Sequence, residues 1–303
     1  MDIKQLRFLV ALDETRHFGQ AAARCHVTQP TLSMRLRGLE DELGLQLVMR
    51  SQRFEGFTAE GERILAWARS LLAAQDGLYA EAASCRGQLV GNLRVGVVPL
   101  AGFNPMRLID LFAAQHPNLH FRLFALSSDE ILERLSRNLL DLGISYLERL
   151  DEALFASLPL GETRMGLLYD PWHFRLPDHS VSWETLSTLP LGMLSSGMHF
   201  RQSIDHALRS RGLYPTPKLE TDAVHHLLQG VCAGLCCAIM PLDSGLGQLA
   251  PHLTLVPIED ANTLAPVGLI LRLDAPRSAL GEACFEEAAS FAAKLAGPLE
   301  NQW

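Results

Sequence analysis

The sequence lacks any uninterrupted stretch of about 18 apolar residues, the length that a membrane-spanning helix requires. Its first ten residues, MDIKQLRFLV, also lack the basic start, the long apolar stretch and the small-residue cleavage site of a secretion signal. These absences predict a protein that stays in the cytoplasm and has no membrane partner.

Cysteine is sparse, with 6 in 303 residues, and only Cys232, Cys236 and Cys237 lie close together. No CxxC pair and no His pair at zinc spacing accompanies them, and His225-His226 has no visible third ligand. We therefore expect free thiols, three clustered cysteines that serve as small buried apolar side chains, and no metal site.

Motifs of the common enzyme classes are also missing. The sequence contains no GxSxG elbow, no GxGxxG after a strand, no Walker A loop and no HExxH. We predict no catalytic residues, no enzymatic activity and no cofactor. One alternative stays open, namely a cytoplasmic small-molecule-binding protein or enzyme whose N-terminal helices serve only for oligomerisation.

An excess of positive charge is absent too, because the formal net charge is −8. The acidity is uneven, since residues 1–58 carry 8 Lys and Arg against 7 Asp and Glu, whereas residues 91–303 carry 15 against 23. A content of 48% hydrophobic and 20% charged residues excludes a disordered chain. The charge distribution leaves room for a DNA-facing module at the N-terminus.

What is present divides the chain into three parts. Residues 1–58 are predicted to form short helices and a small hairpin or wing at 47–57, and residues 59–90 continue as one long helix. Residues 91–303 alternate between strands and helices, which is typical of parallel sheets covered by helices. The predicted strands are 93–98, 121–126, 142–146, 165–169, 191–194, 238–240, 253–257 and 267–271; the predicted helices are 105–115, 128–137, 202–211, 223–233 and 280–296.

The long helix, which begins at Thr58 and extends to about residue 89, has apolar residues at steps of three and four. This heptad pattern predicts that two such helices pair in a homodimer, although the same stripe could instead pack on its own domain. The residues assigned to dimerisation are Ile64, Ala68, Leu71 and Leu78.

The stretch 18–50 is predicted to form a helix, a tight turn and a second helix. Thr28 is a suitable N-cap, and Pro30 lies in the first turn, where its missing N–H costs nothing. Leu32, Leu36 and Leu39 bury one face, so the opposite face suits the major groove of double-stranded DNA, while the wing tip could reach phosphates. The predicted DNA-binding residues are Gln29, Pro30, Thr31, Ser33, Met34, Arg37, Arg50, Ser51 and Arg53.

This stretch resembles the LysR-type transcriptional regulators. The matching motifs are Ala21-Ala22, Thr28-Gln29-Pro30-Thr31-Leu32-Ser33, Arg37-Gly38-Leu39-Glu40, Glu42-Leu43-Gly44 and Thr58-Ala59-Glu60-Gly61. The resemblance implies an α/β protein with an N-terminal winged helix-turn-helix, a linker helix and a periplasmic-binding-protein-like effector-binding domain. It also implies a transcription regulator that binds a dyad-symmetric promoter site as a homodimer or homotetramer.

In that family the C-terminal part consists of two α/β subdomains with a small effector between them. The resemblance places subdomain 1 at 91–161 and 267–303, and subdomain 2 at 162–266. Helix N-termini at the cleft favour a small polar metabolite, most naturally an anion. The effector-binding residues that the resemblance implies are Leu100, Ala101, Gly102, Ser195, Ser196, Met198, His199 and Arg201. Ser127-x-x-Glu130 is instead assigned to structure, as a capping box.

Overall fold

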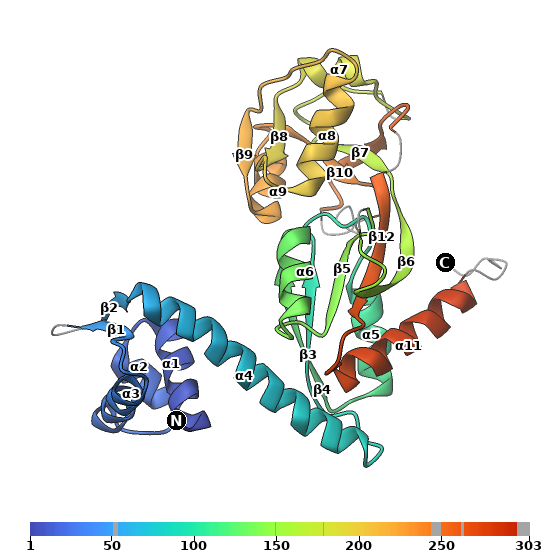
Figure 1. Cartoon of the computed structure of the whole chain (residues 1–303). Coiled ribbons are helices and arrows are strands. Elements are labelled where there is room, and N and C mark those ends of the chain that lie inside the picture. The colour runs from blue at the N-terminus through green and yellow to red at the C-terminus, as the bar shows by residue number, and fades with distance from the viewer. Residues whose placement is uncertain (51–53, 149, 178, 244–249, 262–263, 296–303) are drawn as a thin grey trace. The chain divides into compact units, whose positions relative to one another are not determined.

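The computed structural model describes residues 1–50, 54–148, 150–177, 179–243, 250–261 and 264–295. The chain divides into two compact units, with the boundary along the sequence between Gly87 and Gln88. Figure 1 shows the helices of the first unit and the two sheets of the second. Within the described residues, no helix is both long and apolar enough to cross a membrane.

The N-terminal unit consists of short helices, each of which begins at a capping residue. The Asp2 carboxylate and the Gln5 side chain form a capping box at the first helix, and Thr28 and Thr58 cap the third and fourth. The Nδ1 atom of His17 accepts from the backbone N–H groups of Gly19 and Gln20 and so caps the second helix. The elements are α1 (Ile3–Thr15), α2 (Phe18–Arg24), α3 (Gln29–Leu43), β1 (Val48–Arg50), β2 (Phe54–Phe57) and α4 (Ala59–Ser84).

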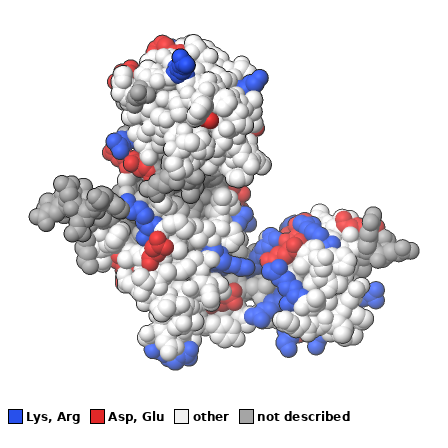
Figure 2. Space-filling view, turned by 180° about the vertical axis from the view of Figure 1, so that it is seen from behind, with Lys and Arg blue, Asp and Glu red and all other residues white. Residues whose placement is uncertain are grey.

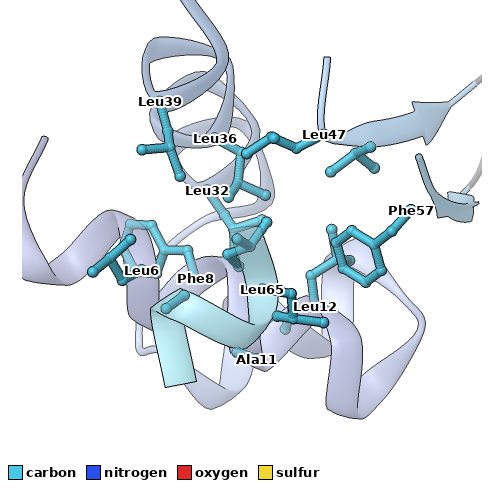
Figure 3. Close-up of a cluster of buried hydrophobic side chains, with 14 of the residues drawn as sticks. Leu6, Phe8, Ala11, Leu12, Leu32, Leu36, Leu39, Leu47, Phe57 and Leu65 are labelled. Atoms are coloured by element: carbon cyan, nitrogen blue, oxygen red, sulfur yellow. The ribbon is translucent and has the colours of Figure 1, made fainter. Parts of the chain in front are cut away.

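One hydrophobic core joins all these elements (Figure 3). Leu9 and Leu12 of α1, with Leu32 and Leu39 of α3, are completely buried in it. The first part of α4 contributes Leu65, which is also buried there. Helix α3, which is predicted to face DNA, therefore packs on this core through leucines at steps of three and four.

The start of α4 fits tightly against residues 46–47, which directly precede β1 of the wing. The hydroxyl of Thr58 donates to the carbonyl oxygen of Gln46 at 2.6 Å and accepts from the N–H of Gly61 at 2.9 Å. A methyl group at Gly61 would lie 2.1 Å from the carbonyl oxygen of Leu47, so only glycine fits there. The predicted Thr-x-x-Gly motif thus joins α4 rigidly to the N-terminal unit.

The long helix is shorter than predicted and is used differently along its length. It ends at Ser84 with Cys85 as C-cap, rather than near residue 89. Ala68 is only 1% exposed because it packs in the core of its own unit, and Ile64 packs against the same core. This corrects the assignment of Ala68 to the dimer seam, because a buried side chain has no surface left for a second chain. Ile64 is partly buried and has little surface left for such a contact.

The C-terminal unit contains two five-stranded sheets. The first has the order β4-β3-β5-β12-β6, with β3 parallel to β4 and β5 but β12 antiparallel to β5 and β6. Figure 1 shows α6 on one side of this sheet and α5 with α11 on the other. Its elements are β3 (Gly91–Val97), α5 (Met106–Gln115), β4 (Leu119–Ala125), α6 (Ser128–Ser136), β5 (Leu142–Tyr146), β6 (Phe155–Thr163), β12 (Leu264–Arg272) and α11 (Ala279–Leu295).

The second sheet has the order β11-β7-β10-β8-β9. Strand β10 runs parallel to β8 and antiparallel to β7, and β7 also pairs with β11 in the antiparallel sense. Its elements are β7 (Met165–Tyr169), α7 (Trp183–Thr188), β8 (Leu191–Leu194), α8 (His199–Arg209), β9 (Leu219–Thr221), α9 (Val224–Cys232), β10 (Cys237–Pro241) and β11 (Thr254–Pro257).

The two sheets are mixed, which corrects the expectation of parallel sheets. Strands β6 and β12 run in opposite directions through the first sheet, because one leaves for the second sheet and the other returns from it. The subdomain boundaries predicted at 161/162 and 266/267 fall inside these two strands.

Candidate functional site

Helix α3 presents its N-terminal turns to solvent. Thr28 accepts from the N–H of Thr31, Pro30 lies in the first turn, and Gly44 ends the helix in the left-handed conformation with φ 64°. The Oε1 atom of Glu40 accepts from the N–H groups of Leu47 and Val48, which fixes the end of α3 to the wing. Both ends of this helix are therefore held by specific contacts.

The structure places the predicted DNA-binding residues of α3 on this outer face. Gln29, Pro30, Met34 and Arg37 are exposed, while Thr31 and Ser33 are half-buried. Met34 is 63% exposed, which is a large value for an apolar side chain. Figure 2 shows Lys and Arg side chains gathered on the surface of the N-terminal unit, at the right of the view.

The wing residues are only partly described. Ser51 and Arg53 lie outside the described residues, and so does the side chain of Arg50, whose backbone ends β1. The base of the wing is described, because Val48 pairs with Phe57. The guanidinium of Arg16 lies 5.8 Å from the ring centre of Phe57 and supports that base.

A cavity of about 700 Å³ lies in the C-terminal unit between segments of the two sheets. Residues from the loop after β4, from α6 and from the end of β5 form one wall. Residues from the start of α7 and from one face of α8 form the other. Its polar lining residues are Ser127, Ser128, Asp129, Tyr146, Glu148, Trp183, His199, Gln202, Ser203, His206, Ser210 and Arg211.

His199 makes the closest contacts across this cavity. Its ring stacks on Tyr146 with the ring centres 4.1 Å apart and an interplanar angle of 22°. Its Nε2 atom lies 3.6 Å from Oε2 of Glu148, and its Nδ1 atom is buried without a partner among the described residues. Burial raises the pKa of Tyr146, so its hydroxyl stays protonated and donates to the carbonyl oxygen of Leu100 at 3.3 Å.

Helices α6 and α8 both begin at the cavity, and their N-termini differ. Ser127 and Glu130 form the predicted capping box at α6, and the hydrogen bonds from Ser127 to the Glu130 carboxylate lower the pKa of that group. Helix α8 begins after Met198, and no side chain caps it. Neither Ser195 nor Ser196 therefore caps α8, and the N–H groups at its start are more available as donors than those of α6.

The predicted loop 100–102 contributes to a different hollow. Leu100 and Ala101 line a second, apolar pocket rather than the large cavity. Gly102 has a φ of 62° and packs against Thr163, where an added methyl group would lie 2.4 Å from the threonine hydroxyl. The structure therefore separates this loop from His199, although the resemblance grouped them.

The remaining predicted effector residues are also separated. Ser195 and Met198 are half-buried and Ser196 is exposed, and none of these three lines the cavity. Arg201 is buried, and its guanidinium donates to the Leu194 carbonyl oxygen, to Asp205 at 2.8 Å and to Glu220 at 3.1 Å. Arg201 does not line the cavity, and its Nε and one terminal nitrogen pair within the protein, so its assignment to the effector stays a prediction.

Most of the cavity's lining was missed from the sequence. Gln202, Ser203, His206 and Ser210 follow His199 at steps of three and four, so they share one face of α8. That polar spacing was the available signal. Trp183 and Arg211 gave none, because they meet only in the folded chain, with the guanidinium 5.0 Å from the ring centre.

Four of the six cysteines have a raised pKa. Burial raises the pKa of Cys237 and Cys284 to about 12, and it also raises the pKa of Cys25 and Cys236. Cys236 and Cys237 are buried as expected from the sequence, whereas Cys232 is exposed, which corrects its assignment to the core. His225 and His226 are exposed on α9, and no group of three metal-ligating side chains occurs in the described part of the chain.

These environments predict a clear order of cysteine reactivity. With iodoacetamide at pH 8, Cys85 and Cys232 of the native protein should alkylate readily. Cys237 and Cys284 should not, because a thiol of pKa about 12 is a thiolate in only about 1 molecule in 10,000 and the thiolate is the nucleophile. Peptide mass spectrometry measures the order, with urea-denatured protein as the control in which all six react. Rapid native labelling of Cys284 would contradict this description.

Comparison with known proteins identifies both units. The family described as bacterial regulatory helix-turn-helix protein, lysR family, matches residues 3–62. The LysR substrate binding domain matches residues 86–293. A hydrogen peroxide-inducible genes activator of Dickeya chrysanthemi is 33% identical over 246 residues, which cover 80% of this chain and 79% of that protein.

Solved structures agree with the fold. CbnR, a LysR family transcriptional regulator, superposes with a TM-score of 0.77 at 20% identity and covers 96% of this chain and 99% of its own. A full-length OxyR variant from Pseudomonas aeruginosa superposes with a TM-score of 0.66 at 27% identity, covering 95% and 98%. The chain belongs to the LysR family of transcriptional regulators, DNA-binding proteins that carry an effector-binding domain.

Proposed function

We propose that this regulator reads its promoter site through the N-terminal face of α3. The observation that carries the proposal is the exposure of Gln29, Met34 and Arg37 on a helix capped at both ends. An amide and a guanidinium are the side chains that form bidentate contacts with adenine and guanine in the major groove. Arg37 is exposed, so its donors are accessible to DNA.

The test compares two kinds of contact. Gln29→Ala should reduce discrimination between promoter and random DNA by about 1–3 kcal/mol, because a base contact is lost. Arg50→Ala should weaken binding to every sequence and reduce the salt slope by about one, because the wing arginine is assigned to a phosphate. Fluorescence anisotropy with promoter and scrambled duplexes at two salt concentrations measures both effects.

Gln115→Ala is the matched control, since Gln115 is an exposed glutamine of the other unit. Unchanged discrimination by Gln29→Ala would show that α3 is not the reading helix as assigned.

We propose further that the DNA-binding form is a homodimer on a dyad-symmetric site. Trp67, Leu71 and Leu78 are 70%, 43% and 67% exposed on α4 and follow each other at steps of four and seven. Such an apolar stripe on a helix fits a second copy of the same helix. A tetramer, which the family resemblance predicts, needs a further contact, and sedimentation of the DNA-free protein distinguishes the two. Because the DNA target lies there, we place the protein in the cytoplasm.

We propose that the effector is a small polar metabolite with an anionic group, bound in the 700 Å³ cavity. The uncapped N-terminus of α8 supports an anion beside His199, because helix N–H groups and the helix dipole favour negative charge. A ligand there would touch both subdomains. It would therefore favour one closure of the cleft, which is the difference in affinity that a switch needs.

His199→Ala should reduce effector affinity about tenfold or more, since a hydrogen bond to a charged group contributes about 1.5–3 kcal/mol. Thermal-shift screening of short carboxylates and sugar phosphates on the wild-type protein provides the ligand, and calorimetry then compares variants. His252→Ala is the control, because His252 is exposed and does not line the cavity. Equal affinity of both variants would place the effector elsewhere.

The Dickeya relative is named as an activator of hydrogen peroxide-inducible genes, and we propose that this chain does not sense an oxidant through the four cysteines whose pKa is raised. Redox-sensing cysteines are accessible and have a low pKa. Here burial raises the pKa of Cys25, Cys236, Cys237 and Cys284. The two exposed cysteines, Cys85 and Cys232, belong to different units. Effector binding in the cavity therefore remains the better-supported input.

A further inference from the structure

The two walls of the 700 Å³ cavity differ in charge. Among the described lining residues, the charged side chains of the first subdomain are Asp129 and Glu148, and both are acidic. The lining residues of the second subdomain include Arg211, His199 and His206 but no acidic side chain. The cavity is therefore polarised across the cleft, whereas a ligand that carried only negative charge would be served better by two positive walls.

The Glu148 carboxylate lies close to the place proposed for the anionic group of the effector. Its Oε2 atom is 3.6 Å from Nε2 of His199, which is too long for a hydrogen bond, and its side chain is 56% exposed. An anion at the start of α8, where His199 is the first residue, would be repelled by this carboxylate. A cationic nitrogen on the same ligand would turn that repulsion into attraction.

Asp129 supplies a second acidic group on the same wall. It lies in the first turn of α6, is exposed and lines the cavity. Capping of α6 does not depend on it, because Ser127 and Glu130 already form the capping box there. The Asp129 carboxylate is therefore available to a ligand, although its position also suits the dipole of the helix.

We propose that the effector is a zwitterion of the amino acid type. Its ammonium group binds to Glu148 and Asp129 of the first subdomain, and its carboxylate binds to His199 and the N–H groups at the start of α8 in the second. In an α-amino acid both charges are carried on one carbon atom, so a small ligand reaches both walls. Each subdomain then attracts the opposite end of the ligand, which favours closure of the cleft. This inference rests on the proposed effector function and names the chemical class of the effector.

Matched ligands test the class on the full-length protein. Each proteinogenic amino acid is screened by thermal shift beside the acid that lacks its amino group and the amine that lacks its carboxylate; for L-leucine these are isocaproate and isoamylamine. At least one amino acid should raise the melting temperature. Calorimetry should then show that its acid and its amine each bind about tenfold or more weakly, because each loses one charge-assisted contact.

Charge-neutral variants test the residues. Glu148→Gln and Asp129→Asn keep the shape of the side chain and should each weaken binding of the amino acid about tenfold. Neither should weaken binding of the matched acid, because that ligand has no ammonium group to lose. His199→Ala should weaken both ligands. Glu152→Gln is the control, since Glu152 is exposed and does not line the cavity, and it should change neither affinity.

The outcomes separate this inference from the proposed function. Equal affinity for an amino acid and its matched acid, with both lost in His199→Ala, would overturn the zwitterion and leave an anionic effector in the cavity. Binding of no amino acid in the panel, or binding that survives both Glu148→Gln and Asp129→Asn, would also overturn it. An amino acid that shows the full pattern but leaves the affinity for promoter DNA unchanged would contradict the regulatory role and leave the ligand class standing.

Discussion

Replacing Asp141 with alanine is expected to lower the free energy of unfolding of the C-terminal unit by about 3–5 kcal/mol, the usual cost of removing one partner from a buried ion pair. Asp141 is 5% exposed and accepts three hydrogen bonds from Arg94. They come from the backbone N–H at 2.8 Å, from Nε at 2.9 Å and from a terminal guanidinium nitrogen at 2.8 Å. Without the carboxylate, the largely buried guanidinium loses its counter-charge.

Urea unfolding followed by tryptophan fluorescence measures this loss, because Trp172 and Trp183 both lie in the C-terminal unit. Asp274→Ala is the matched control, since Asp274 is exposed and should change stability by no more than about 0.5 kcal/mol. The double variant Arg94→Leu with Asp141→Leu should recover part of the loss, because no charge is then buried alone. A loss below about 1 kcal/mol for Asp141→Ala would show that the pair contributes no more than a surface ion pair.

Replacing Leu78 with glutamate is expected to weaken self-association about 100-fold or more, since an unpaired charge in an apolar seam costs about 3–5 kcal/mol. Leu78 is 67% exposed in the single chain and lies on the same stripe of α4 as Leu71 and Trp67. Affinity for a full dyad site should fall with the dimer, while binding to a half-site should not change. Sedimentation velocity and half-site anisotropy measure the two effects.

Ala66→Glu is the control, because Ala66 is exposed on another face of α4. A dimer that tolerates Leu78→Glu but dissociates with Ala66→Glu would show that the interface lies on the face of Ala66 and not on that of Leu78.

The predictions from sequence succeeded where one short pattern determined a structure. Residues 142–146, 165–169 and 191–194 were predicted as strands with the bounds that β5, β7 and β8 have, because each is a short apolar run that is buried throughout. Strand β6 was missed, because it lies at the edge of its sheet, contains Pro159 and buries only its two end residues, Phe155 and Thr163. Strand β9, also at an edge, has three residues and gives too little pattern to detect.

The candidate sites divide in the same way. The α3 surface follows from a contiguous motif, in which Leu32, Leu36 and Leu39 determine the buried face and hence the exposed one. The cavity depends on residues that are far apart in the sequence, such as Tyr146 and His199, whose contact exists only after both subdomains have folded. Arg201 shows the converse, because its pairing with Glu220 could not be read from its position at a helix start.

The rigid start of α4 has a consequence for how the protein measures DNA. Thr58, Gly61 and Leu65 fix the helix to the reading unit, and Leu71 and Leu78 on the same helix are proposed to meet the second chain. The angle around α4 between these two sets of residues thus sets the direction in which each α3 points relative to the dimer axis. Inserting a single residue between Ala68 and Leu71 would turn that direction by about 100°, so the protein would demand a different half-site spacing while keeping every base contact.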